Sequence, residues 1–213
     1  MSKSSNDVSM SVIRRLPRYY RFLGKLIQKN IPRISSKKLS EMLGITASQI
    51  RQDLHCFGEF GQQGYGYNVN DLHKEIGDIL GISHQTNAIL IGAGNLGKAI
   101  LSYMNFNDKG FNLVGVFDQN IDLIGKNIAK YDVLNISDLK NFCEKNSPKV
   151  AILCIPQEGA ESLAQTLVDL GIKGFWNFSH YDFAINFDNV IVENVHISDS
   201  LLTLCFQMGK LNQ

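Results

Sequence analysis

The chain has 213 residues, of which 44% are hydrophobic and 19% charged, a composition typical of a globular protein that buries one large core or two smaller ones. No apolar run approaches the roughly 20 residues of a membrane-spanning helix, and the first residues lack the apolar centre of a secretory signal. We therefore expect a cytoplasmic protein with no membrane partner.

Charge is distributed unevenly along the chain. Residues 1–62 carry 11 Lys and Arg against 4 Asp and Glu, a net charge of +7, and the rest carries 10 against 16, a net charge of −6. A basic head followed by an acidic body suggests two parts with different partners. The four cysteines, at positions 56, 143, 154 and 205, form no CxxC pair, so we expect reduced thiols and no metal site, with a redox-active thiol as the alternative.

The basic head shows three helical patterns. Apolar residues recur at helical spacing over residues 12–29 and again over residues 36–43, where Gly44 ends the pattern. A third helix begins at Thr46, whose hydroxyl is placed to cap it, and Gln49 completes a capping box.

A glycine-rich segment follows these helices. Four glycines within residues 58–69 predict a tight hairpin, and residues 71–81 are typical of a connecting helix. Two short helices joined by a glycine-containing turn, with a polar second helix and a hairpin after it, form a winged helix-turn-helix. The alternative is a small helical subdomain with a solvated charged face.

In a winged helix-turn-helix the second helix lies in the major groove of DNA, with its N-terminal side chains at the base edges. Its polar residues are then placed for bases, and nearby basic residues are placed for phosphates or bases. The candidate DNA-binding residues are Thr46, Ser48, Gln49 and Gln52 for bases, Arg51, Lys37 and Lys38 for phosphates or bases, and Ser36, Ala47, Gln62, Gln63 and Tyr65 beside them.

From residue 87 onward, short apolar runs alternate with helical patterns. The runs are continuous, as expected for strands covered by helices on both faces, and the alternation is typical of a doubly wound α/β domain. The expected strands span residues 87–92, 111–117, 149–155, 173–178 and 190–193, and the expected helices span 95–105, 136–145, 158–170 and, at the end of the chain, 198–210. The last of these is more apolar than a terminal helix normally leaves in water.

The segment IGAGNLG, residues 91–97, follows the first expected strand and has the GxGxxG spacing of a dinucleotide-binding turn. Gly92 permits the tight turn, Gly94 lets backbone amides reach a pyrophosphate, and Gly97 lets the helix pack closely, so that its N-terminal N–H groups face the phosphates. Asp118 ends the next strand, where its carboxylate would accept hydrogen bonds from ribose hydroxyls and repel a 2′-phosphate. The pattern favours NAD(H) over NADP(H), with a ligand-free glycine turn as the alternative.

The sequence offers few candidate catalytic residues to accompany this turn. A dehydrogenase usually places a His, Lys or Tyr acid/base beside the nicotinamide, together with a cation that orients the substrate. The histidines after the motif are His180 and His196, and no sizeable substrate domain follows it. We therefore expect no catalytic residues and no enzyme activity; the rival hypothesis is a small NAD-dependent dehydrogenase with an accessory basic domain.

Taken together, these segments resemble the Rex family of redox-sensing transcriptional repressors. The resemblance implies a homodimer whose winged helices bind a palindromic double-stranded operator, with NAD+ permitting binding and NADH causing release. It also implies that the C-terminal helix is exchanged between protomers. The matching segments are RRLPRYYRFL (14–23), ISSKKLSEMLGITASQIRQDLHCFGEFG (34–61), GYGYNV (64–69), GAGNLGKAILSY (92–103), FD (117–118), AILCIP (151–156), GIKGFWNF (171–178) and VENV (192–195).

The chain departs from the family pattern at three places. In the recognition helix Gln52 and His55 replace a lysine and a serine, and in the wing Gln62-Gln63 replaces a basic pair, which should weaken contacts to phosphates. The family often has an acidic residue after VENV that pairs with an arginine of the first helix and a tyrosine of the nucleotide domain. The resemblance assigns this switch to Arg21, Tyr103 and His196, an imidazole in the acidic position, or to Asp199 in its place.

The sequence thus predicts a winged helix-turn-helix domain with its connecting helix over residues 1–82, a Rossmann domain over 83–196 and a dimerisation helix over 197–213. The expected function is a transcriptional repressor that senses the NADH/NAD+ ratio; a third hypothesis is a DNA-binding protein in which NAD(H) is structural. The expected cofactor-binding residues are Gly92, Ala93, Gly94, Asn95, Leu96, Gly97, Asp118, Pro156 and Phe178.

Overall fold

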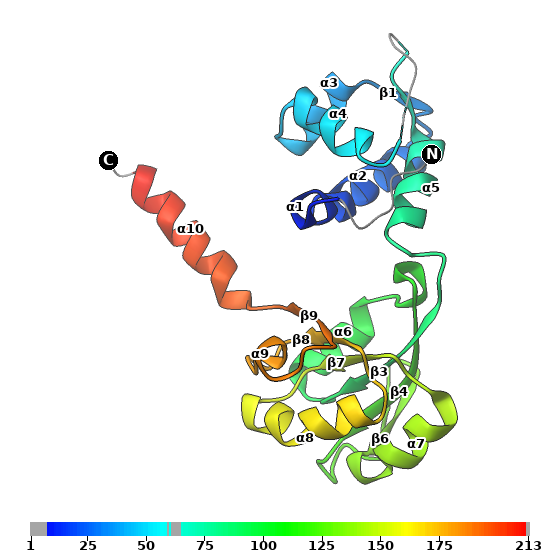
Figure 1. Ribbon diagram of the computed structural model, residues 1–213, viewed down its shortest axis with the longest axis vertical. Helices are drawn as coiled ribbons and strands as arrows, with labels where there is room; N and C mark the ends of the chain where they lie inside the picture. Colours follow the sequence, from blue (N-terminus) through cyan, green and yellow to red (C-terminus); the bar gives the residue numbers. More distant parts are fainter. Residues whose placement is uncertain (1–7, 59, 61–64, 212–213) are drawn as a thin grey trace. The chain divides into compact units, whose positions relative to one another are not determined.

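The computed structural model describes residues 8–58, 60 and 65–211. The chain divides into two compact units, Met1–Ser83 and His84–Gln213, which are described separately below (Figure 1).

The first unit is mainly helical. Its elements are α1 (Met10–Ile13), α2 (Leu16–Gln28), β1 (Arg33–Ile34), α3 (Ser36–Leu43), α4 (Ala47–His55), β2 (Tyr67–Asn68) and α5 (Val69–Ile79). The helical pattern expected over residues 12–29 is divided between α1 and α2, which a turn at residues 14–15 separates. Pro17 lies in the first turn of α2, where its missing N–H breaks no helical hydrogen bond.

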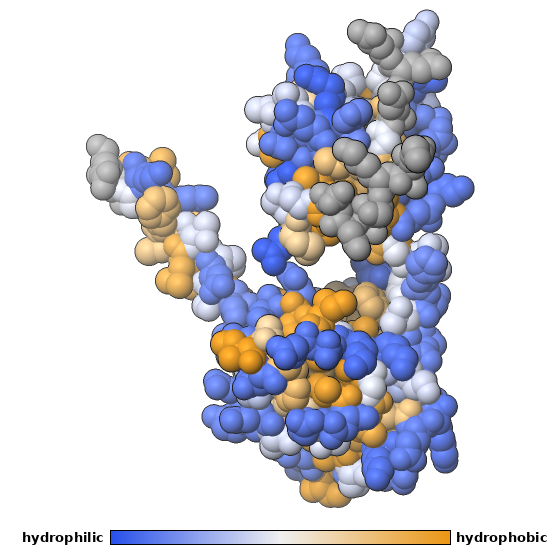
Figure 2. Space-filling view, viewed as in Figure 1, coloured by the Kyte–Doolittle hydropathy of each residue, from blue (hydrophilic) through white to orange (hydrophobic). Residues whose placement is uncertain are grey.

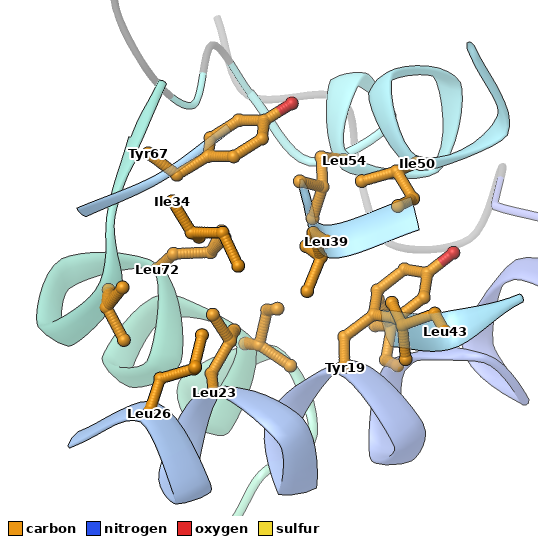
Figure 3. Packing of buried hydrophobic residues seen from close by; sticks show 13 residues of the cluster. Tyr19, Leu23, Leu26, Ile34, Leu39, Leu43, Ile50, Leu54, Tyr67 and Leu72 are labelled. Carbon is orange, nitrogen blue, oxygen red and sulfur yellow. The ribbon is translucent and has the colours of Figure 1, made fainter. Parts of the chain in front are cut away.

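The core of this unit is built from the inward faces of four helices and the short strand pair. Leu23 and Leu26 of α2 face Leu72 of α5 across the lower part of the core, and Leu39 of α3 lies near Ile50 of α4 above them (Figure 3). The periodicity of the apolar residues in α2 and α3 is what orients these faces inward.

The helix-turn-helix is fixed by its caps. The Ser35 hydroxyl accepts the Lys38 N–H and starts α3, and Gly44 ends α3 in the left-handed conformation with φ 65°. The Thr46 hydroxyl then accepts the Gln49 N–H at 3.1 Å, which confirms the expected N-cap of α4.

Two short strands close the unit beside the helices. β1 and β2 pair antiparallel, with Arg33 opposite Asn68 and Ile34 opposite Tyr67. This pair could not be predicted from the sequence, because two-residue strands carry no period-two signal. The hairpin expected over residues 58–69 lies partly outside the described residues, since residues 59 and 61–64 are not described.

The second unit is a seven-stranded sheet with helices on both faces (Figure 1). Its strands are β3 (Thr86–Ile91), β4 (Phe111–Asp118), β5 (Asn127–Ile128), β6 (Tyr131–Asn135), β7 (Val150–Leu153), β8 (Gly174–Asn177) and β9 (Ile191–Asn194). Its α-helices are α6 (Asn95–Tyr103), α7 (Leu139–Asn146), α8 (Gln157–Asp169), α9 (Phe183–Asn186) and α10 (Ile197–Leu211).

The strand order is β5-β6-β4-β3-β7-β8-β9, and every pair is parallel except β5 with β6. The chain moves outward from β3 in one direction through β4 and β6, and then returns to the other side of β3 through β7. This reversal makes β3 and β7 the switch point, where a doubly wound sheet opens a crevice at the carboxyl ends of its strands.

The five strands and the helices expected in this unit are present with shifted bounds. The strands β5 and β6 and the short helix α9 were missed, and the helix expected over 136–145 begins as a 3-10 turn at Ile136–Asp138 before α7. The sequence YDVLN of β6 has only two strongly apolar residues among its last three positions, too weak a pattern to mark a strand.

Helix α10 carries a long exposed apolar surface. Its exposed residues include Leu201 and Leu202, each 67% exposed, and Phe206, 65% exposed. Figure 2 shows apolar side chains along this helix. In the described residues no helix is long and apolar enough to cross a membrane.

Candidate functional site

A cavity of about 280 Å³ opens at the switch point of the sheet. It lies at the carboxyl ends of β3, β4 and β7, and its walls include the glycine turn after β3 and the first turns of α8. The residues that line it are Ile91, Gly92, Gly94, Asp118, Gln119, Ile136, Cys154, Ile155, Pro156, Gly159, Ser162 and Leu163. Two helices, α6 after Gly94 and α8 after Pro156, begin beside this cavity, so amides without intrahelical partners border it.

Close packing around the turn leaves no room for a side chain at two of its three glycines. Gly92 has φ 98°, and a side chain there would collide with the carbonyl of Cys154, the residue that follows the neighbouring strand β7. At Gly97, a Cβ atom would collide with the carbonyl oxygen of Gly92, which places the start of α6 directly against the turn. A Cβ atom at Gly94 would meet no atom within 4 Å, so this glycine leaves open space on the cavity side.

Asp118 ends β4 beside the same turn. Its carboxylate accepts the Ala93 N–H at 2.7 Å and the Asn120 N–H at 2.8 Å, so it is oriented by the glycine turn before any ligand binds. Each carboxylate oxygen has a second lone pair, which leaves acceptor capacity toward the cavity. An anionic group at this place suits ribose hydroxyls and opposes a phosphate.

The structure gathers most of the expected cofactor residues at one place. Gly92, Gly94, Asp118 and Pro156 line the cavity, and the segment Asn95–Gly97 forms the first turn of α6. The expected residue Phe178 does not line this cavity; its ring packs edge-on against Trp176 at 4.8 Å in another cluster.

Several lining residues were not singled out from the sequence. Gln119 follows Asp118 directly, and Ile155 precedes Pro156, so their proximity to the cavity follows from strand ends at a switch point. Gly159 and Ser162 lie on α8 at i,i+3 spacing, and only the fold shows that this face meets the cavity.

Cys154 lies beside the cavity, but burial raises the pKa of its thiol to about 12. A protonated thiol is a poor nucleophile and resists oxidation.

The basic face of the first unit is formed by the start of α3 and the outward face of α4. Ser48, Arg51 and Gln52 are exposed on α4, at spacings that place them on one side of the helix. The Arg51 guanidinium donates to the Ser36 hydroxyl at 3.0 Å, which joins α4 to the start of α3. Lys37 is exposed next to Ser36, so a hydroxyl and two cations gather at this corner.

The remaining expected DNA-binding residues that the structure describes differ in exposure and in hydrogen bonding. Tyr65 is 70% exposed at the end of the wing segment, and its carbonyl accepts a hydrogen bond from Arg33 at 3.5 Å. The expected wing contacts Gln62 and Gln63 lie outside the described residues. The Thr46 hydroxyl is engaged as the cap of α4, and Ala47 is half-buried.

A cluster of four polar side chains, called the Asp53 cluster below, lies between α2 and α4. Asp53 is 1% exposed and accepts hydrogen bonds from Arg15 Nε at 2.6 Å and Nη2 at 2.7 Å, from the Tyr19 hydroxyl at 2.5 Å and from Gln49 Nε2 at 2.8 Å. Burial alone would raise the pKa of Asp53, but these hydrogen bonds outweigh it and hold the pKa below its usual range. The burial of Asp53 could not be predicted from the sequence, because an aspartate in a polar helix fits the pattern of a solvated face.

The switch residues implied by the resemblance fall on both units. Arg21 is exposed on α2, whereas Tyr103 is 91% exposed at the end of α6 in the second unit. The His196 ring stacks on that of His180 at 4.7 Å, and its Nδ1 is buried without a hydrogen-bond partner among the described residues. Asp199 is exposed in the first turn of α10, with its N–H donating to the His196 carbonyl.

Comparison with known proteins finds a matching family model for each unit and relatives that match the full chain. Residues 7–55 match the family model described as "Putative DNA-binding protein N-terminus", and residues 83–181 match the model described as "CoA binding domain". Over 210 residues the chain is 51% identical to the redox-sensing transcriptional repressor Rex of Clostridium botulinum, covering 99% of each protein. It is 49% identical to the Rex protein of Clostridium novyi over 212 residues, covering 100% of each.

Solved structures give the same result. A crystal structure of RSP in complex with β-NAD+ and operator DNA matches with a TM-score of 0.87 and 50% identity over 96% of this chain and 94% of that one. The structure of RSP with β-NADH matches with a TM-score of 0.87 and 47% identity over 97% and 96%. The expected fold class is confirmed, although exchange of the C-terminal helix is not shown. With a basic helix-turn-helix, a dinucleotide cradle and relatives of this identity over the full length, the chain belongs to the Rex family of redox-sensing transcriptional repressors.

Proposed function

We propose that this protein binds operator DNA through its first unit and NAD(H) through its second, and that the redox state of the cofactor sets its affinity for DNA. The observation that carries the proposal is the glycine turn packed against Asp118 and two helix N-termini, in a chain that also holds an exposed basic helix-turn-helix. Its family consists of repressors and not enzymes, in agreement with the expectation of no enzyme activity.

In the cofactor site, the amides after Gly94 would bind the pyrophosphate, and the Asp118 carboxylate would accept hydrogen bonds from the adenosine ribose. Pro156 borders the crevice at the start of α8. Phe178 remains a proposed contact only through the resemblance. The cofactor would be bound as a ligand that is sensed; RSP, the related repressor, has been crystallised with β-NAD+ and with β-NADH.

In the DNA site, α4 would enter the major groove with its exposed face toward the bases. Lys37 and Arg51 would contact phosphates, and Gln62, Gln63 and Tyr65 would contribute contacts from the wing. Since DNA and reduced nucleotide pools are cytoplasmic in a cell without a nucleus, we place the protein in the cytoplasm.

A homodimer is part of the same proposal, because a palindromic operator presents two equivalent half-sites. The exposed apolar residues of α10 need a cover, and the sheet offers an apolar cavity of about 570 Å³ lined by Phe106, Trp176 and Ile191 among others. We propose that α10 of a second copy contributes to the dimer interface, as the resemblance implies.

The switch would couple the two units through Arg21, Tyr103 and the segment from His196 to Asp199. NADH would release the operator only if it binds more tightly to the dimer state that fits DNA poorly, because a ligand shifts an equilibrium by its differential affinity. With His196 in the acidic position, we propose Asp199, three residues further along the chain, as the carboxylate for Arg21.

The test is binding of a fluorescein-labelled palindromic operator, followed by fluorescence anisotropy while NADH or NAD+ is titrated. We expect NADH to weaken operator binding by at least about tenfold and NAD+ to leave it intact. An operator affinity that is equal at saturating NADH and NAD+ would contradict redox sensing and would support a structural role for the nucleotide. Turnover of NADH with a substrate would instead support the dehydrogenase hypothesis.

A further inference from the structure

The Asp53 cluster joins the recognition helix to the rest of the DNA-binding unit. Arg15 and Tyr19 come from the start of α2, whereas Gln49 and Asp53 are one turn apart on α4. Figure 3 shows Tyr19 rising from α2 with its hydroxyl end toward the part of the core that α4 covers. The cluster therefore spans the contact between these two helices.

The cluster restricts how α4 can move. A buried carboxylate is tolerated only while its hydrogen bonds are complete, and Asp53 at 1% exposure receives four of them. The Arg15 guanidinium donates two parallel bonds, a geometry that a rotation or slide of α4 would break. Apolar contacts through Ile50 and Leu54 have no such directional requirement, so the polar cluster sets the orientation of α4.

The same geometry fixes the side chain of Gln49. An ionised carboxylate only accepts hydrogen bonds, so the amide nitrogen of Gln49 must face Asp53 Oδ1, at 2.8 Å. Gln49 is half-buried on the side of α4 that carries Asp53, whereas Ser48, Arg51 and Gln52 are exposed. Only one half of the capping box that the sequence predicts is formed among the described residues: the Thr46 hydroxyl accepts the Gln49 N–H, whereas the Gln49 side chain makes its hydrogen bond to Asp53.

We propose that the Asp53 cluster orients the recognition helix, and that Gln49 is a positioning residue of this cluster while Ser48, Arg51 and Gln52 read the operator. The proposal rests on operator binding as the function of this unit. It replaces the sequence-based assignment of Gln49 as a contact to bases. Gln49 would affect every operator equally, because it acts through the placement of α4.

The experiment compares Gln49→Ala with Gln52→Ala, a matched change on the exposed face of the same helix. Affinities of the full-length protein are measured for one operator and for its set of single-base-pair variants. We expect Gln49→Ala to weaken all of them by a common factor of about three to ten, so that the order of preference is unchanged. We expect Gln52→Ala to relax discrimination at one base pair, by about tenfold.

Two results would overturn the proposal: loss of discrimination at a single base pair in Gln49→Ala, or an affinity unchanged for every operator. Unmodified protein that fails to bind any operator would instead contradict the proposed function itself. NADH affinity, measured by nucleotide fluorescence, reports on the other unit and is expected to be the same in both variants.

A second variant separates positioning from general loss of folded protein. Arg15→Lys retains the charge but loses the two-bond fork, and Arg18→Lys is the control, because Arg18 is exposed on α2. With folding of the DNA-binding unit checked by urea unfolding of the full chain, we expect Arg15→Lys to weaken all operators by a common factor. Its effect should be less than multiplicative with Gln49→Ala, since both disturb one cluster. Independent, multiplicative effects would contradict a shared positioning role.

Discussion

At the scale of single residues, two glycines of the turn differ in the space that surrounds them. Gly97 has no room for a side chain because the Gly92 carbonyl lies against it, whereas Gly94 has open space where a Cβ atom would lie. The sequence motif treats the two glycines alike. The structure indicates that Gly97 is needed for the fold of this unit, and we propose that Gly94 serves the close approach of a ligand.

This difference gives a prediction for Gly94→Ala and Gly97→Ala. We expect Gly97→Ala to lower the free energy of unfolding of the second unit by about 1–3 kcal/mol, as overpacking does, and to weaken NADH binding. Gly94→Ala should leave stability within about 0.5 kcal/mol and still weaken NADH binding at least about tenfold. Urea unfolding and NADH fluorescence titration measure the two effects. Equal loss of stability in both variants would contradict the assignment.

Residue patterns predicted the residues that line the cavity of the second unit better than the contacts that the side chains of α4 make. The glycines and Asp118 follow from a short motif with a fixed backbone geometry, so the sequence was sufficient to place them together. Gln49 and Asp53 are different, because both are polar residues of a polar helix. Whether such a residue points toward DNA or into a buried cluster depends on Arg15 and Tyr19, at least 30 residues away in sequence.

At the scale of elements, helices α2 and α5 are joined by an aromatic stack. The ring of Tyr20 on α2 lies 4.0 Å from that of His73 on α5, with 20° between their planes. Glycines permit this approach, since a Cβ atom at Gly77 would lie 3.1 Å from the Tyr20 ring and one at Gly24 would lie 3.4 Å from His73 Nε2. Helical periodicity predicted both helices but not this contact, because glycine lowers the helical signal at the positions where the rings meet.

Because His73 is partly buried in this contact, we expect the free energy of unfolding to depend on pH. Burial lowers the pKa of His73, so the folded state binds fewer protons than the unfolded state, in which the pKa is about 6.5. As far as His73 determines it, the free energy of unfolding is therefore highest above about pH 6.5, and it decreases as the pH falls below that value. The lowered pKa of Asp53 gives a separate loss, which begins only below about pH 4.

The measurement is urea unfolding of the full chain between pH 5 and pH 8, compared with His73→Phe, which retains a ring but cannot titrate. We expect the decline of stability between about pH 6.5 and pH 5 to be smaller in the variant. An identical slope in the two proteins would show that His73 does not titrate with unfolding.

At the scale of the whole molecule, the chain joins a DNA-binding unit to a nucleotide-binding unit, and its last helix exposes the apolar residues that a second copy would cover. Doubly wound topology was predictable because continuous apolar runs alternate with helices. The surface that covers α10 was not, because no residue of this helix is buried among the described residues. The apolar excess of residues 198–210 was the signal that the sequence offered.

The dimer hypothesis can be tested on α10 itself. We expect Leu201→Glu combined with Phe206→Glu to raise the dimer dissociation constant at least about 100-fold, because burying two such side chains contributes about 3–6 kcal/mol. Gln207→Glu, a polar exposed position of the same helix, is the matched control and should dimerise normally. Analytical ultracentrifugation measures the assembly, and operator titration should show a parallel loss of affinity, because a monomer contacts one half-site only. Normal dimerisation of the double variant would exclude α10 from the interface, whereas a monomer with unchanged operator affinity would show that two half-sites are not bound together.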